Sequence, residues 1–94
     1  MPRLRCSAES KEDLKQIARF IARDKPAAAR RWLAKLREKC RLVANHPDVG
    51  DARPELGENI RSTYVGSYVI FFRHVEGYLE IVRVIRGDVD DPDI

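Results

Sequence analysis

The fold is decided by residues 59–86, which read NIRSTYVGSYVIFFRHVEGYLEIVRVIR. Three runs rich in β-branched and aromatic residues, at 59–65, 67–75 and 78–86, are separated by Gly66 and by the pair Glu76 and Gly77. Such runs, bounded by glycine, predict three β-strands. Both connections are too short for a crossover helix, so we expect neighbouring strands to run antiparallel.

The last of these runs indicates which side chains share a face of the sheet. Strict alternation places Leu79, Ile81, Arg83 and Ile85 on one face and Glu80, Val82, Val84 and Arg86 on the other. Both sets are largely apolar near the middle of the strand. We therefore expect the uncovered face to expose apolar and arginine side chains together, which suits a binding surface better than a purely solvated one.

Before the strands, the chain has the pattern of a short strand and a helix. Residues 3–7, RLRCS, alternate and predict an edge strand, and a helix is expected over about 9–23. Ser7 or Ser10 is the expected N-cap, and Ser10 with Asp13 resembles a capping box. The residues with helical spacing on the apolar side are Leu14, Ile17, Ala18 and Ile21.

A second helix follows after a short break. Residues 24–26, DKP, end the first helix, and Pro26 suits the first position of a helix that runs to about residue 45. Its apolar stripe consists of Ala29, Trp32, Leu33, Leu36, Cys40 and Val43, and its other faces carry Arg30, Arg31, Lys35, Arg37, Lys39 and Arg41. Because the break is short, we expect the two helices to form an antiparallel hairpin. Trp32 is expected to anchor the core, since its neighbours on the stripe are aliphatic.

The element order is therefore β-α-α-β-β-β, with a loop at 46–59 that contains two prolines and two glycines. The apolar side of the hairpin must be covered, and the sheet offers the surface. The sequence predicts an α+β fold in which a helical hairpin packs on one face of a small antiparallel sheet. At 94 residues the chain, 1–94, is expected to be one domain, because a second core would leave each half too small.

The charge is unevenly distributed along the chain. It holds 18 Lys and Arg against 15 Asp and Glu, but four of the acids fall within residues 88–94, so residues 1–87 carry 18 basic and 11 acidic side chains. We expect the acidic segment 88–94 to be a mobile tail. A basic body favours an acidic partner, which could be a nucleic acid, an acidic protein or a polyanionic surface.

Other classes of protein are not favoured. No apolar run approaches the length of a membrane span and the N-terminal residues lack an apolar signal core, so we expect no membrane association and a cytoplasmic protein. Cys6 and Cys40 belong to no metal or redox motif and are expected to be reduced, buried thiols. We expect no metal and no cofactor.

Several motifs together resemble one family. They are Ser7, Ala8, Asp13, Leu14 and Ile17 in the first helix, His46, Pro47 and Gly50, then RPEL at 53–56, IR at 60–61, GSYVIFFR at 66–73 and EIVRVIRG at 80–87. In order and spacing they resemble the ParE/RelE toxin superfamily, most closely its ParE branch. The resemblance implies a bacterial toxin encoded beside a ParD-like antitoxin. ParE-like toxins are associated with inhibition of DNA gyrase, and RelE-like relatives are ribonucleases that cut messenger RNA on the ribosome.

The RelE-like activity can be weighed against the chemistry it needs. Cleavage of RNA without a metal needs a base, an acid and a cation that holds the phosphate charge, and arginine can supply only the cation. An mRNA endoribonuclease would use Glu55 as base and Arg61 or Arg83 as phosphate clamp. The nuclease relatives tend to place a histidine or tyrosine near the end of the last strand, where this chain has Arg86, Gly87 and Asp88. The RelE-like activity is the alternative hypothesis.

The leading hypothesis is a toxin without catalytic residues that binds DNA gyrase and forms a hetero-oligomer with its antitoxin. The candidate target-binding residues are Arg61, Arg73, Arg83 and Arg86. The candidate antitoxin-binding residues are Leu14, Ile17, Ile21 and Arg83, since a disordered, acid-bearing amphipathic segment could cover them. We expect no direct, sequence-specific nucleic-acid partner for such a toxin. A third hypothesis is a non-toxic DNA- or RNA-binding module that uses the basic second helix, with steeply salt-dependent binding that changes at Arg30, Arg31 or Lys35 would weaken.

Overall fold

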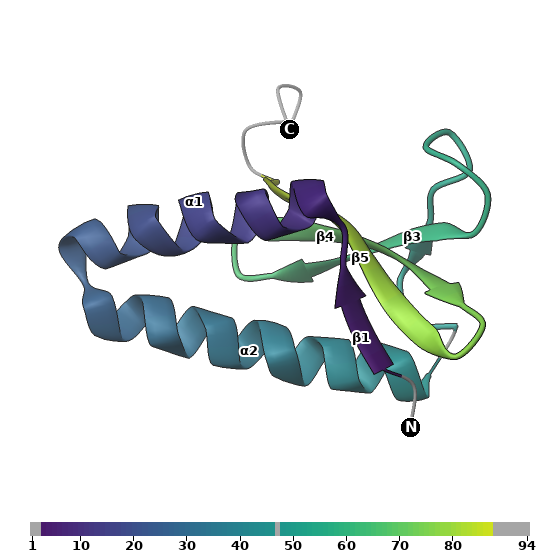
Figure 1. The fold of residues 1–94 in the computed structure, drawn as a ribbon, viewed down its shortest axis with the longest axis horizontal. Coiled ribbons are helices and arrows are strands. Elements are labelled where there is room, and N and C mark those ends of the chain that lie inside the picture. The colour runs from purple at the N-terminus through teal and green to yellow at the C-terminus, as the bar shows by residue number, and fades with distance from the viewer. Residues whose placement is uncertain (1–2, 47, 88–94) are drawn as a thin grey trace.

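The computed structural model describes residues 3–46 and 48–87, and the chain forms two layers, a helical hairpin and a five-stranded sheet (Figure 1). The elements are β1 (Arg3–Cys6), α1 (Ala8–Asp24), α2 (Pro26–Asn45), β2 (Asp51–Ala52), β3 (Ile60–Val65), β4 (Tyr68–Val75) and β5 (Tyr78–Arg86). Every predicted helix and strand is confirmed to within one residue at each end. The expected acidic tail, 88–94, lies outside the described residues.

The sheet is mixed, with the strand order β1-β5-β4-β3-β2. Strands β3, β4 and β5 are antiparallel as predicted, and β2 pairs antiparallel with β3. Strand β1 runs parallel to β5, with Arg3 opposite Tyr78 and Cys6 opposite Ile81. The expectation of a purely antiparallel sheet was therefore wrong. No tight turn joins β1 to β5, so no hairpin sets its direction. The two-residue strand β2 was missed because it lies in a segment without apolar alternation.

The first helix begins at Ser7, which also ties it to the sheet. The Ser7 hydroxyl oxygen accepts the backbone N–H of Ser10 at 3.0 Å and donates to the carbonyl of Val82 at 2.7 Å, while the Ser7 N–H donates to the carbonyl of Ile81 at 3.0 Å. Ser10 is fully buried and its hydroxyl donates to the Ser7 carbonyl. The capping box with Asp13 was a wrong prediction, because the Asp13 carboxylate bonds to β5 instead.

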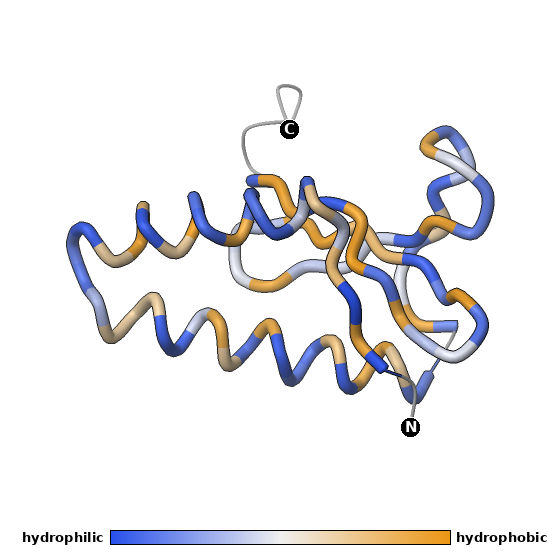
Figure 2. Tube along the Cα trace, viewed as in Figure 1, coloured by the Kyte–Doolittle hydropathy of each residue, from blue (hydrophilic) through white to orange (hydrophobic). Residues whose placement is uncertain are grey.

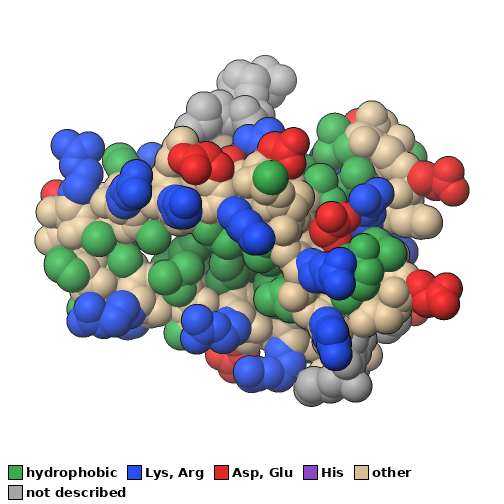
Figure 3. Space-filling view, in the orientation of Figure 1, with side chains coloured by type: hydrophobic (Ala, Val, Ile, Leu, Met, Phe, Trp, Pro, Cys, Tyr) green, Lys and Arg blue, Asp and Glu red, His purple; other side chains and the backbone are tan. Residues whose placement is uncertain are grey.

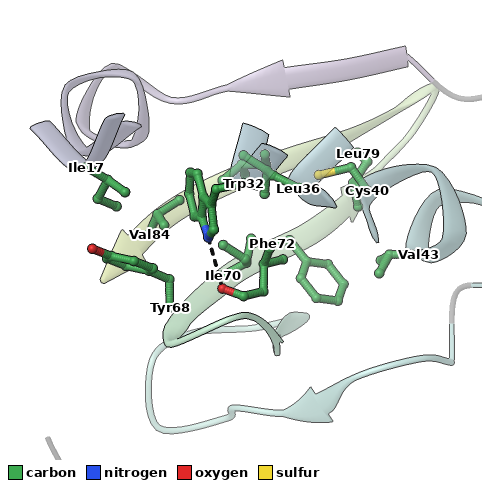
Figure 4. Close-up of a cluster of buried hydrophobic side chains, with 12 residues drawn as sticks. Ile17, Trp32, Leu36, Cys40, Val43, Tyr68, Ile70, Phe72, Leu79 and Val84 are labelled. Carbon is green, nitrogen blue, oxygen red and sulfur yellow. Dashed lines mark hydrogen bonds between the residues drawn. The ribbon is translucent and has the colours of Figure 1, made fainter. Parts of the chain in front are cut away.

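The core lies between the helical hairpin, mainly α2, and one face of the sheet, as the close-up in Figure 4 shows. Trp32 is its anchor as predicted, and the residue is 7% exposed. Its ring meets the ring of Tyr68 edge to face with the centroids 5.2 Å apart, and its indole N–H donates to the carbonyl of Val65 at 3.1 Å. The other core residues are Ile17, Leu36, Cys40, Val43, Val65, Ile70, Phe72, Leu79, Ile81 and Val84. Hydrophilic residues of α2 gather on the side turned away from α1 and the sheet (Figure 2).

A β-bulge in β5 changes which residues share a face. Phe72 lies opposite Ile81 and Phe71 lies opposite Arg83, so Val82 is an extra residue in the ladder. After Ile81, the next buried residue of β5 is therefore Val84 and not Arg83. The predicted division of faces is wrong from Arg83 onward, since one inserted residue reverses the alternation that follows.

Candidate functional site

The face of the sheet turned away from the core is the first candidate surface, and we call it the open face. By strand register it holds Ser62, Tyr64, Val69, Phe71, Arg73, Glu80, Val82, Arg83 and Ile85. Tyr64 is 54% exposed, and Phe71, Val82 and Ile85 are half-buried. Apolar, aromatic and arginine side chains thus share this face, and the bulge is what adds Arg83 to it.

Arg83 is held by a carboxylate from the helical layer. Its Nε donates to Asp13 Oδ2 at 2.7 Å and its Nη2 donates to Asp13 Oδ1 at 3.1 Å. Burial acts most strongly on the pKa of the Asp13 carboxyl and would raise it, but hydrogen bonds from Arg83 and from the Val84 N–H, with the charge of Arg83, outweigh burial and lower the pKa. The hydrogen bond to Asp13 is also the main cause that raises the pKa of Arg83.

The other arginines of the open face are also paired. Arg73 Nε lies 2.6 Å from Glu80 Oε1 across β4 and β5. Arg53, which precedes β3 in the loop, donates from Nε to the Ser62 hydroxyl at 2.9 Å and places its guanidinium 5.9 Å from the centre of the Phe71 ring. These contacts fix the guanidinium groups in place around Phe71.

The structure separates the four predicted target-binding arginines. Arg73 and Arg83 lie on the open face, but Arg61 shares the opposite face with Phe72 and donates to the carbonyl of Gly50 at 2.9 Å. The guanidinium of Arg86 lies 5.7 Å from the ring centre of Phe20 on α1. One surface that contains all four does not exist. Sequence reasoning missed Arg53, a loop residue that only the tertiary fold brings to Phe71.

The three residues of the ribonuclease alternative are not brought together either. Glu55 is an exposed loop carboxylate 3.5 Å from Arg53. Arg61 faces the other side of the sheet, where it ties down the loop at residues 48–50. Arg83 lies on β5, two strands away from β3, and its guanidinium is paired with the Asp13 carboxylate of α1. Among the described residues no three His, Cys, Asp or Glu side chains form a group that could hold a metal ion.

A second candidate surface is a groove between β1 and α2, which we call the apolar groove. It consists of two adjoining cavities of about 170 and 190 Å³, which share Leu4, Arg37 and Cys40. Leu14, Leu33 and Leu36 line the first cavity, and Arg3 and Arg41 border the second. Figure 3 shows hydrophobic side chains in a hollow between the two helices, with Lys and Arg on both sides.

The predicted antitoxin-binding residues meet this groove only in part. Leu14 lines it, whereas Ile17 is 8% exposed and belongs to the core, and Ile21 is half-buried against the core. Leu4 is 46% exposed at the groove and was missed. The alternation at 3–7 indicated that Leu4 lies in a strand, but the sequence did not show which strand pairs with it.

Both cysteines are free and line the apolar groove. Cys40 is 5% exposed, and burial, followed by the charge of Cys6, raises the pKa of its thiol to about 11. Cys6 is half-buried. The expectation that both are reduced and buried therefore describes Cys40 better than Cys6.

The chain is similar to one protein family in sequence and to a solved structure in fold. A family model described as "ParE toxin of type II toxin-antitoxin system, parDE" matches residues 4–90. A solved structure of the chromosomal ParDE TA system from P. aeruginosa has a similar fold, with a TM-score of 0.70 and 19% sequence identity over 92% of this chain and 96% of that chain. No curated protein matches significantly. Within the described residues, no helix has the length and apolar character that crossing a bilayer requires.

Proposed function

The chain belongs to the ParE toxin family of type II toxin–antitoxin systems, and from this premise we propose that it arrests growth by binding and inhibiting DNA gyrase. In this proposal the toxin acts in the cytoplasm as an inhibitory protein, not as a catalyst. A ParD-like antitoxin neutralises it by direct binding. The open face is the surface that binds the target.

The arrangement around Phe71 is the observation that supports this proposal. Protein interfaces are enriched in aromatic residues and arginine at their centre. Arg73 and Arg83 on the open face, and Arg53 from the adjoining loop, are each held by a hydrogen bond or ion pair around apolar side chains. Side chains that are fixed before binding lose less conformational entropy when a partner docks, so this surface is prepared for a protein partner.

The apolar groove fits the other partner, the antitoxin. Its floor is lined by leucines and its borders carry Arg3, Arg37 and Arg41. An amphipathic segment of the antitoxin would place apolar side chains on the leucines and carboxylates beside the arginines. Such a segment would also cover the hairpin and β1, while the open face lies on the other side of the sheet.

One experiment separates gyrase inhibition from the RelE-like alternative. The chain is induced in cells with and without the small gene encoded beside it, and plasmid supercoiling and transcript integrity are measured in the same samples. We expect growth arrest and loss of supercoiling with intact transcripts, and rescue by the neighbouring gene. Transcript cleavage with unchanged supercoiling would overturn gyrase as the target and favour the ribonuclease.

A further inference from the structure

The positive charge of the chain is concentrated on one helix. Six of the 18 Lys and Arg residues lie on α2, together with one of the 15 Asp and Glu, Glu38. The remainder of the chain holds 12 basic and 14 acidic side chains, so it is slightly acidic. The whole net positive charge of +3 therefore comes from α2.

These cations face away from the core. Arg30, Arg31, Lys35, Arg37 and Arg41 are exposed and Lys39 is half-buried. From Arg30 to Arg41 they extend over about 16 Å of helix, at a rise of about 1.5 Å per residue. Figure 3 shows Lys and Arg side chains along the outer edge of α2.

The pairing of these cations differs from that of the open face. Within residues 3–46 and 48–87, no ion pair involves any of the six α2 cations, whereas three arginines of the sheet and its loop are paired with carboxylates. Cations without a carboxylate partner on the same surface keep their attraction for an external polyanion. On the open face, in contrast, Arg73 and Arg83 are each paired with a carboxylate.

We propose that the outer face of α2 binds the phosphate backbone of duplex DNA without reading its sequence. Duplex DNA carries a charge about every 1.7 Å along its axis, so cations spread over this length of the exposed face of α2 can neutralise several phosphates at once. Backbone contacts of this kind position a protein on DNA but do not specify a base sequence. The contact is additional to the binding of gyrase and does not depend on it.

Other polyanions fit this helix less well. Binding of single strands relies on several aromatic rings on which successive bases stack. Trp32 of α2 is buried in the core, and the cavity that Lys35 and Lys39 line holds one exposed aromatic residue, Tyr64. An anionic membrane needs an exposed apolar side beside the basic one. The apolar side of α2 packs on the sheet and lines the apolar groove, and Leu42 is the one large apolar residue of α2 that is exposed.

The test uses fluorescence anisotropy of short labelled duplexes, titrated with the purified chain at several salt concentrations. Two duplexes of unrelated sequence are compared. We expect equal affinity for both and a slope of log K against log salt of about −4.5, since five exposed cations meeting phosphates give about −0.9 each. The α2 variant carries three changes away from the apolar groove, Arg30→Gln, Arg31→Gln and Lys35→Gln. We expect it to lower the magnitude of the slope by about 3.

The matched control removes the same net charge from α1, where acidic residues alternate with basic ones. It carries Lys11→Gln, Lys15→Gln and Arg19→Gln, and we expect its slope to change by less than about 1. Thermal unfolding shows whether both triple variants fold; if the α2 triple does not, Arg30→Gln and Lys35→Gln are measured singly, each with an expected change of about 1. Equal losses in both triples, no binding to either duplex at low salt, or binding to phosphatidylserine vesicles but not to duplex would each overturn the proposal.

Discussion

The carboxylate of Asp13 on α1 receives two hydrogen bonds from Arg83 on β5, 70 residues later in the chain. The same carboxylate accepts the backbone N–H of Val84 at 3.0 Å. Strand β1 pairs with β5 only as far as Ile81, so Asp13 occupies the edge of β5 just beyond the end of β1. One side chain therefore joins the helical layer to the bulge and fixes Arg83 on the open face.

Removal of this carboxylate should destabilise the chain. We expect Asp13→Ala to lower the free energy of unfolding by about 2 kcal/mol, because two charge-assisted hydrogen bonds and one to the backbone are lost, while the exposure of Arg83 limits the effect. Urea denaturation measures it. Glu12→Ala, which removes an exposed carboxylate bonded only to Gln16 among the described residues, is the control and should change stability by less than about 0.5 kcal/mol. Equal losses in the two variants would contradict this role for Asp13.

The same contact should make stability depend on acid pH. The folded pKa of Asp13 is lowered below its ordinary value of 3.8, so its contribution is present above that value and is lost as the pH falls through the folded pKa. We expect the difference in unfolding free energy between wild type and Asp13→Asn to be largest near neutral pH and to shrink at acid pH. A difference that stays constant from neutral to strongly acid pH would show that the charge of Asp13 contributes nothing.

The two thiols should react at different rates. The thiolate is the nucleophile, and Cys40 is 5% exposed with a thiol pKa raised to about 11, while Cys6 is half-buried. We expect iodoacetamide at mildly alkaline pH to alkylate Cys6 first and Cys40 only after denaturation, as followed by peptide mass spectrometry. Rapid labelling of Cys40 in the folded protein would mean that the apolar groove opens readily.

A change at the border of the apolar groove should separate neutralisation from toxicity. Leu4 is 46% exposed there, so Leu4→Glu should leave folding intact but place a carboxylate where an acid-bearing segment docks. We expect cells that express this variant to remain arrested when the antitoxin is co-expressed. Leu56→Glu, at 52% exposure in the loop before β3, is the matched control and should still be rescued. Rescue of both variants would exclude the groove as the antitoxin site.

Much of the fold could be predicted, because helical and strand periodicities are local properties of the sequence. The apolar stripe of the second helix, which contains Trp32, and the three strands at 59–65, 67–75 and 78–86 could be predicted without knowledge of the tertiary contacts. The bulge at Val82 could not be predicted, since it exists only in the pairing of β5 with β4. The capping box with Asp13 was also a wrong prediction, because the partner of Asp13, Arg83, is distant in the sequence.

The candidate site was predicted less well than the fold. Alternation counted along single strands could not show that Arg61 and Arg73 lie on opposite faces of the sheet, because that depends on how β3 and β4 pair. It also could not bring Arg53 from the loop to Phe71. The apolar groove depends on the parallel placement of β1, which no turn in the sequence specifies.

The central claim, that the toxin inhibits gyrase through the open face, is tested most directly by titrating purified gyrase in a supercoiling assay. Wild type is compared with Tyr64→Ser on the open face and with Phe20→Ser on α1, two aromatic residues of almost equal exposure, 54% and 53%. We expect wild type and Phe20→Ser to inhibit alike and Tyr64→Ser to need at least about tenfold more protein, because a central aromatic contact is commonly worth 1.4 kcal/mol or more. No inhibition by wild type, or equal inhibition by all three proteins, would contradict the account.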